Sequence, residues 1–173
     1  MENEFIVPEV SESSGNYFKL KWEGSKKIRI ISNWGVGFEI WKDKKPKRSK
    51  DLATLPQQWD PDTYGKPTIP REFWAIGIYN ITDKKLELWT CNLITVRRAI
   101  QELSKNPDRG NPTGYDLTIT KKKNGDKTDY IVTPSPLVKL ADEEQEVIDW
   151  HWFDWSELYV DDRKVISEKE SKF

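Results

Sequence analysis

Two stretches rich in basic residues give this sequence a way to bind a polyanion. The first holds five cations in seven residues, Lys42, Lys44, Lys45, Lys47 and Arg48, and the second holds Lys121, Lys122 and Lys123. Nine Trp, six Tyr and six Phe residues accompany them. Cationic side chains neutralise phosphates, and aromatic rings stack on unpaired bases. Where these residue types share a surface, we therefore expect binding of single-stranded nucleic acid.

Acidic and basic residues are divided unevenly along the chain. Residues 1–141 carry 24 basic and 18 acidic side chains, whereas residues 142–173 carry 4 and 11, so a cationic body precedes an anionic end. This asymmetry is typical of a nucleic-acid surface in one part and a partner-binding segment in the other. An ordinary solvated surface is the alternative, and the positions of the charges in the fold must decide between them.

The reactive residues give little support to catalysis. One cysteine, Cys91, and one histidine, His151, cannot assemble a zinc cluster or a disulfide framework. His151 has no nucleophile nearby, and the glycine pair Gly35 and Gly37 lacks the third glycine of a phosphate loop. We therefore expect a protein that is not an enzyme and that needs no metal and no cofactor.

The sequence gives no sign of membrane insertion or secretion. No apolar run approaches the roughly 20 residues that a membrane helix needs. Residues 1–4 lack the basic start of a signal peptide. We expect a cytoplasmic protein without a membrane partner.

The pattern of apolar residues predicts a mainly-β chain. Period-two alternation indicates five strands, at residues 17–41, 73–80, 86–90, 115–120 and 128–132. The last two flank Asn124-Gly125, the typical residue pair of a tight hairpin turn. After the third strand, the spacing of Val96, Ile100 and Leu103 predicts one helix over residues 92–105.

Three strands, a helix and two strands follow in the order of the OB-fold, a five-stranded Greek-key barrel of the all-β class. Residues 42–72 hold five prolines and predict a long loop between strands 1 and 2. Both basic stretches fall on the loops that flank the ligand face of this fold, so we expect them to border one groove. The domains are then a flexible leader (1–16), a nucleic-acid-binding barrel (17–140) and an acidic, Trp-rich C-terminal tail or helix (141–173).

Alternation also predicts which side chains face the ligand. On the second strand Ile76 and Ile78 would face the core, which leaves Phe73 and Tyr79 outside. By the same rule Trp89 on the third strand points outward and its leucine neighbours point inward. With the first-strand arginine and two nearby indoles, the predicted nucleic-acid interface is Arg29, Trp34, Trp41, Phe73, Tyr79 and Trp89, with Lys42, Lys44, Lys45, Lys47, Arg48, Lys121, Lys122 and Lys123.

Several segments are similar to those of one known family. They include Ile28-Arg29-Ile30-Ile31-Ser32, Gly37-Phe38-Glu39-Ile40-Trp41, Pro112-Thr113-Gly114-Tyr115-Asp116 and Thr133-Pro134-Ser135-Pro136. Over residues 17–140 the chain resembles bacteriophage OB-fold single-stranded DNA-binding proteins. The resemblance implies a non-catalytic protein that coats single-stranded DNA in phage replication and recombination and presents it to replication enzymes. Gly77 departs from the family, where a longer polar side chain would be expected.

The C-terminal segment combines acidic residues with aromatic rings. Residues 142–162 hold nine acidic side chains and no basic one. The spacing of Ile148, Trp152, Trp155 and Tyr159 predicts an amphipathic helix. The family resemblance implies an acidic tail that docks replication proteins, for which the predicted partner-binding residues are Trp150, Trp152, Trp155 and Phe173.

Two alternatives stay open at this point. The aromatic segment either contacts a partner protein or packs on its own barrel or on a second subunit, where it would cover an apolar patch. The function has an alternative as well. The protein would then be an interaction or inhibitor module whose acidic aromatic C-terminus is the working surface and whose barrel is a scaffold.

Overall fold

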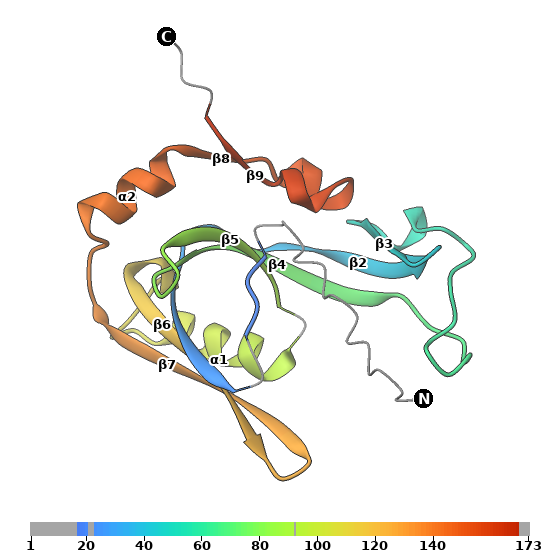
Figure 1. The fold of residues 1–173 in the computed structure, drawn as a ribbon, viewed down its shortest axis with the longest axis horizontal. Helices are drawn as coiled ribbons and strands as arrows, with labels where there is room; N and C mark the ends of the chain where they lie inside the picture. The colour runs from blue at the N-terminus through green and yellow to red at the C-terminus, as the bar shows by residue number, and fades with distance from the viewer. Residues whose placement is uncertain (1–16, 21–22, 92, 170–173) are drawn as a thin grey trace, which may run out of the picture.

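The computed structural model describes residues 17–20, 23–91 and 93–169 (Figure 1). This part of the chain is mainly β, as predicted from the sequence. The predicted leader and the predicted partner-binding residue Phe173 lie outside the described residues. Within the described ranges, no helix is long and apolar enough to cross a membrane.

The described residues form nine strands, two α-helices and four short 3-10 helices. The strands are β1 (Gly24–Ile30), β2 (Gly35–Lys42), β3 (Lys45–Ser49), β4 (Arg71–Asn80), β5 (Lys85–Thr90), β6 (Tyr115–Asn124), β7 (Lys127–Leu137), β8 (His151–Phe153) and β9 (Ile166–Glu168). The helices are α1 (Ile94–Lys105), α2 (Asp142–Asp149), η1 (Leu52–Thr54), η2 (Pro112–Gly114), η3 (Trp155–Tyr159) and η4 (Asp162–Lys164). The predicted first strand is thus divided into β1 and β2, and the predicted loop 42–72 contains β3.

Strand β4 is the centre of the main sheet. Its first half pairs with β2 and its second half with β1, while β5 pairs along the second half as well. The strand order is β3-β2-β4-β1-β6-β7, with β5 beside β4, and these pairings are antiparallel. No pairing between β5 and β7 occurs among the described residues, so the predicted closed barrel is not observed. Helix α1, which follows β5 in the chain, packs against β7.

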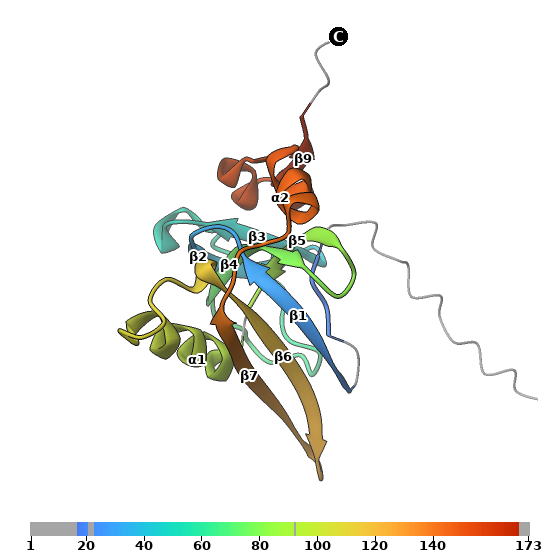
Figure 2. The same ribbon diagram turned by 90° about the vertical axis from the view of Figure 1, so that its left-hand side faces the viewer.

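Two apolar cores lie on the two faces of β4. Ile76 and Ile78 belong to the first core, together with Ile100 of α1. Phe73 and Tyr79 belong to the second core, which the C-terminal segment completes from the other side. Figures 1 and 2 show this segment, from α2 to β9, lying across the sheet on the face opposite α1. Because successive strand residues point to opposite faces, β4 is buried on both sides.

The register of the β4–β5 hairpin corrects the predicted faces of β5. Ile76 pairs with Trp89, and Tyr79 pairs with Leu86. Cross-strand partners share a face, so Trp89 lies in the first core, where its ring centroid is 5.0 Å from that of Phe18. The prediction that Trp89 shares an outer face with Tyr79 is therefore wrong. Alternation within one strand does not set its register against the next, which the turn fixes.

Glycines allow the C-terminal segment to lie close to the sheet. A Cβ atom at Gly77 would lie 2.9 Å from Cε1 of Phe153, and one at Gly35 would lie 2.7 Å from Cδ2 of Leu158. Contacts this short require the facing side chain to shift if either glycine is replaced by a larger residue. Gly77 thus leaves room for the Phe153 ring against β4.

Polar side chains fasten the C-terminal segment to the sheet. Asp162 accepts hydrogen bonds from the Tyr17 hydroxyl and the Arg48 guanidinium. Arg48 also pairs with Glu39 at 2.7 Å and lies over the Phe73 ring, 4.9 Å from its centroid. Burial and the hydrogen bond to Asp162 raise the pKa of the Tyr17 phenol, which therefore keeps its proton at neutral pH. These contacts join η4 to β3.

The aromatic C-terminal residues do not form the predicted helix. Helix α2 ends at Asp149, and the next residues form β8, which pairs with β9. Trp155 stacks on Phe153 with ring centroids 6.3 Å apart and packs against the second core. The segment therefore packs on its own sheet, as one of the two alternatives stated, and Trp155 is part of that packing rather than of a free surface.

Candidate nucleic-acid interface

Four of the predicted contact residues lie inside the protein. The exposed fractions are 3% for Arg29, 1% for Phe73, 2% for Tyr79 and 5% for Trp89. The prediction that these side chains meet a ligand at the surface is therefore wrong. The outer face of β4, where Phe73 and Tyr79 point, is covered by the C-terminal segment, and Trp89 points to the opposite face.

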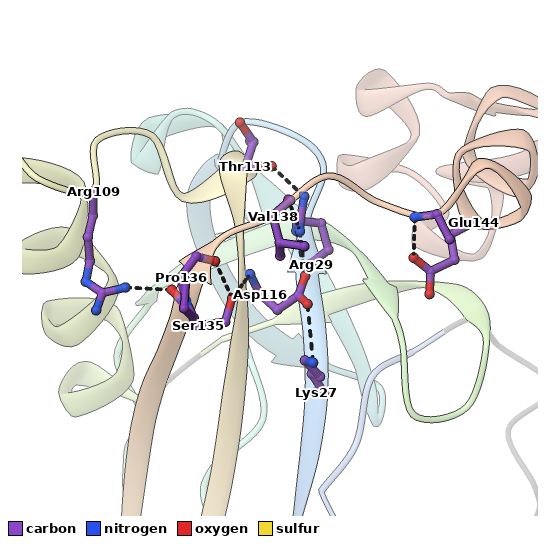
Figure 3. Close-up of polar contacts among 10 residues, drawn as sticks. Lys27, Arg29, Arg109, Thr113, Asp116, Ser135, Pro136, Val138 and Glu144 are labelled. Atoms are coloured by element: carbon purple, nitrogen blue, oxygen red, sulfur yellow. Dashed lines mark hydrogen bonds and ion pairs between the residues drawn. The ribbon is translucent and has the colours of Figure 1, made fainter.

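Arg29 serves a buried ion pair instead of a phosphate. Its guanidinium lies 2.7 Å from Oδ1 of Asp116 and donates to the carbonyl oxygens of Thr113 and Val138 (Figure 3). Ser135 accepts a hydrogen bond from the backbone N–H of Asp116 at 2.9 Å. Arg29 thus links β1 to β6, to η2 and to the residue that follows β7.

The two predicted basic clusters have different surroundings. Lys44, Lys45 and Lys47 are exposed on and beside β3, and Lys42 is half-buried, whereas the predicted contact Arg48 is held by Glu39 and Asp162. Lys122 and Lys123 are exposed at the β6–β7 hairpin and form no ion pair with another described residue; Lys121 lies 5.9 Å from the Tyr130 ring centroid. In Figure 1 this hairpin projects away from the sheet, whereas β3 lies beneath the C-terminal segment. The cavities that Lys44, Lys45 and Lys47 line include no residue of the β6–β7 hairpin. The structure therefore does not bring the two clusters to one of these cavities.

One groove carries an exposed indole beside the first cluster. It has a volume of about 880 Å³ and lies between β2, the loop before β4 and the start of α1. Trp41 is 52% exposed there, near Lys44, Arg71 and Arg97. We call it the Trp41 groove. It combines a stacking surface with three cations.

Four carboxylates also line the Trp41 groove, and each has a partner in the protein. Asp60 accepts from the backbone N–H groups of Asp43 and Lys44, at 3.1 and 2.8 Å. Glu72 accepts from Nε1 of Trp74 at 2.8 Å. The other two are Glu39, paired with Arg48, and Asp62, which caps its own loop at Tyr64 and Lys66. These acids hold the loop and the β2–β3 turn in place.

A second cleft adjoins this groove through Arg97. Its volume is about 330 Å³, and Trp34 and Trp74 line it. The two indole centroids are 5.3 Å apart at an interplanar angle of 68°, and the Arg97 guanidinium lies over Trp74, 4.9 Å from the ring centroid. We call it the Trp34 cleft. The two adjoining cavities thus bring together three indoles and the Arg97 cation.

Part of the predicted interface therefore lines cavities in the structure, and residues that were not predicted line the same cavities. Trp34 is half-buried and Trp41 is exposed, and both line cavities. Arg71, Trp74 and Arg97 were not among the predicted contacts. Arg97 could not be predicted as a contact, because its stacking on Trp74 depends on how α1 docks against the sheet.

The reactive residues of the described chain show no second type of site. In residues 17–20, 23–91 and 93–169, no group of three or more His, Cys, Asp and Glu side chains could hold a metal ion. Burial raises the pKa of the Cys91 thiol to about 11, which leaves it protonated and unreactive at neutral pH. Comparison with known proteins finds no matching family model, no matching curated protein and no matching solved structure.

Proposed function

We propose that this protein binds single-stranded DNA without strong sequence preference and without catalysis, along the Trp41 groove and the Trp34 cleft. The observation that carries this proposal is the exposed indole of Trp41 in a groove that continues into the Arg97–Trp74 stack. Unpaired bases stack on indoles whatever their sequence, and cations beside them neutralise the phosphates. Lys42, Lys45 and Lys47 extend the cationic surface along β2 and β3.

The order of elements supports an open OB-like arrangement, with β1 and β2 as the two halves of its first strand. We accordingly propose that the protein coats exposed strands in phage-type DNA replication and recombination, as the family resemblance implies. The ligand path differs from the one predicted, since the outer face of β4 is occupied by the C-terminal segment.

Salt dependence tests this proposal. Binding of a labelled oligo-dT, followed by anisotropy, should weaken with rising salt, and log affinity should fall with log salt at a slope of about −0.7 for each phosphate contact. Tryptophan fluorescence should be quenched on binding, because indoles contact the bases. In the double variant Lys44→Ala, Arg71→Ala, which removes two exposed cations of the Trp41 groove, the slope should become shallower by about 0.7 for each phosphate that is no longer neutralised.

A matched control separates local contacts from net charge. Lys105→Ala with Lys164→Ala removes the same charge from exposed positions on α1 and η4. This control should keep the slope of the unmodified protein. Absence of salt-dependent binding, or equal effects of the two double variants, would overturn the proposed interface.

A second function is favoured by one further observation. Trp150 and Trp152 are 53% and 61% exposed on the acidic C-terminal segment, and large aromatic side chains are frequent anchors of protein interfaces. We propose that these two residues dock replication proteins. Trp150→Ala with Trp152→Ala should abolish binding to such a partner and leave affinity for oligo-dT unchanged; loss of DNA affinity would assign them to the DNA interface instead.

A further inference from the structure

We propose that the Trp34 cleft takes up one unpaired nucleobase and reads its edge with amide side chains, so that binding has a base preference. This inference rests on the proposed function and adds a base preference, which the proposed function does not require. It concerns residues that no other observation has assigned, namely Asn33, Gln101 and Asn111.

The size and lining of the cleft suit a small planar heterocycle. Its volume of about 330 Å³ lies at the lower end of the range of ligand pockets and holds one base rather than a length of strand. The floor is apolar, because Ile30, Ile76 and Ile100 are 3%, 1% and 2% exposed. An apolar floor favours the flat face of a base over a phosphate or a sugar.

Stacking and charge are both available at the wall of the cleft. Trp34 meets Trp74 edge to face, with centroids 5.3 Å apart. Arg97 covers Trp74 at 4.9 Å and also lines the Trp41 groove. A base beside Trp34 would therefore stack on indole while its phosphate lies toward a guanidinium, and the strand would continue into the Trp41 groove.

The rim of the cleft offers free amide groups. The side chains of Asn33 and Gln101 are exposed and make no hydrogen bond to another described residue. Oδ1 of Asn111 accepts from the backbone N–H of Thr113 at 3.1 Å, which leaves the Asn111 amide nitrogen free to donate. A side-chain amide carries a donor and an acceptor side by side, which match the N6 donor and N7 acceptor of adenine. An unpaired adenine presents such a pair on two edges, N6 with N7 and N6 with N1, whereas thymine has a single donor, N3–H, between O4 and O2. Two amides can therefore each engage adenine through a donor and an acceptor, but only one can do so with thymine, so we expect adenine to be preferred.

The test compares oligo-dA and oligo-dT of equal length with the full chain at one moderate salt concentration. The unmodified protein should bind oligo-dA more tightly, and the double variant Asn33→Ala, Gln101→Ala should reduce the ratio of the two affinities about tenfold. Trp34→Ala should weaken binding of both strands by about tenfold. Gln57→Ala, an exposed amide in the loop outside the cleft, is the matched control and should change neither affinity.

The outcomes separate this inference from the proposed function. Equal affinity of the unmodified protein for the two strands, or an unchanged ratio in the double variant, would overturn the base-reading cleft while salt-dependent binding still supported the proposed function. Absence of binding to either strand would overturn both. Asn33 and Gln101 are exposed, so we expect the double variant to have the same thermal unfolding midpoint as the unmodified protein, which would show that its fold is intact.

Discussion

Arg29 and Asp116 illustrate how single residues with the chemistry of a ligand site come to serve the fold. Arg29 donates to the Asp116 carboxylate and to two carbonyl oxygens, and only 3% of its surface is exposed. Its charge is compensated within the protein, and phosphate could reach it only by displacing these partners. At the same scale, the 52% exposure of Trp41 leaves that ring available to a ligand.

Removal of the Asp116 carboxylate should destabilise the protein strongly. In Asp116→Ala the buried Arg29 cation loses its partner at 2.7 Å, and loss of one member of a buried ion pair costs about 3–5 kcal/mol. Urea unfolding followed by circular dichroism measures the change. Asp129→Ala, at an exposed carboxylate that accepts from Asn124, should change the free energy of unfolding by less than about 0.5 kcal/mol. Equal stability of Asp116→Ala and the unmodified protein would contradict the structural role of the pair.

The buried Cys91 thiol should lower the stability of the fold at alkaline pH. Burial raises the pKa of its thiol from 9.0 to about 11, so between these pH values the folded state binds more protons than the unfolded state. The contribution of Cys91 is thus constant below about pH 9 and is lost as the pH rises toward 11. Near pH 10 the loss should amount to about 1 kcal/mol.

The Cys91→Ala variant separates the effect of thiol titration on stability from the effect of titration of the buried tyrosines. Its free energy of unfolding should be offset from that of the unmodified protein by a constant amount below about pH 8, and the offset should change only at higher pH. An offset that stays constant through pH 10 would show that the thiol titrates equally in both states.

At the scale of elements, the C-terminal segment behaves as part of the fold. Leu158 and Val165 are 1% and 0% exposed in the second core, opposite Phe73 and Tyr79 of β4. Asp162 adds a polar fastening through Tyr17 and Arg48. An acidic tail that only solubilises the protein would bury no such residues.

Leu158→Ala should therefore lower the stability of the whole fold. Loss of a buried leucine side chain costs about 2–5 kcal/mol, depending on how far the site can collapse. Val160→Ala is the matched control, since Val160 lies two positions on and is 84% exposed. If thermal unfolding gave the same midpoint for both variants, the segment would be an independent tail rather than half of the second core.

The elements show how far the sequence could predict the fold. Alternation found β4 to β7, and the predicted hairpin joins β6 to β7. Its two loop residues are Gly125 and Asp126 rather than the predicted Asn124 and Gly125, and Gly125 has a φ of +62°. Helix α1 lies within the predicted range. These features depend on residues close in sequence. The register that turns Trp89 inward depends on the β4–β5 turn, and the cover over Tyr79 depends on residues about 80 positions later, so neither could be predicted from a local pattern.

The candidate site, like the fold, could be predicted only in part from the sequence. Trp34 and Trp41 were predicted from their places beside a bend and a lysine cluster, and both remain accessible. The stack of Arg97 on Trp74 joins a helix to a strand through tertiary packing, which residue types alone do not reveal.

At the scale of the whole molecule, the separation of a basic body from an acidic C-terminal segment should affect how fast the protein associates with DNA. Glu143 and Glu146 are exposed on α2, whereas Glu144 caps the helix by accepting from the N–H of Ala141. Glu143→Gln with Glu146→Gln removes two negative charges and leaves that cap intact. We expect association with oligo-dT at low salt to be about two- to tenfold faster, because the field of the protein then attracts the strand more strongly.

Stopped-flow fluorescence at low and high salt measures this effect. The gain should disappear at high salt, where charges more than about 3 Å apart are screened at roughly 1 M. A rate that is unchanged at low salt would contradict long-range repulsion by α2, and a gain that persists at high salt would point to a direct contact instead.

The close contact of Gly77 with Phe153 limits which residue position 77 can hold. A side chain at position 77 and a ring at position 153 exclude each other, because a Cβ atom would lie 2.9 Å from the ring. Any residue larger than glycine at position 77 therefore requires the Phe153 ring to move from its place against β4. The absence of a side chain at one strand position thus sets how closely the C-terminal segment approaches the sheet.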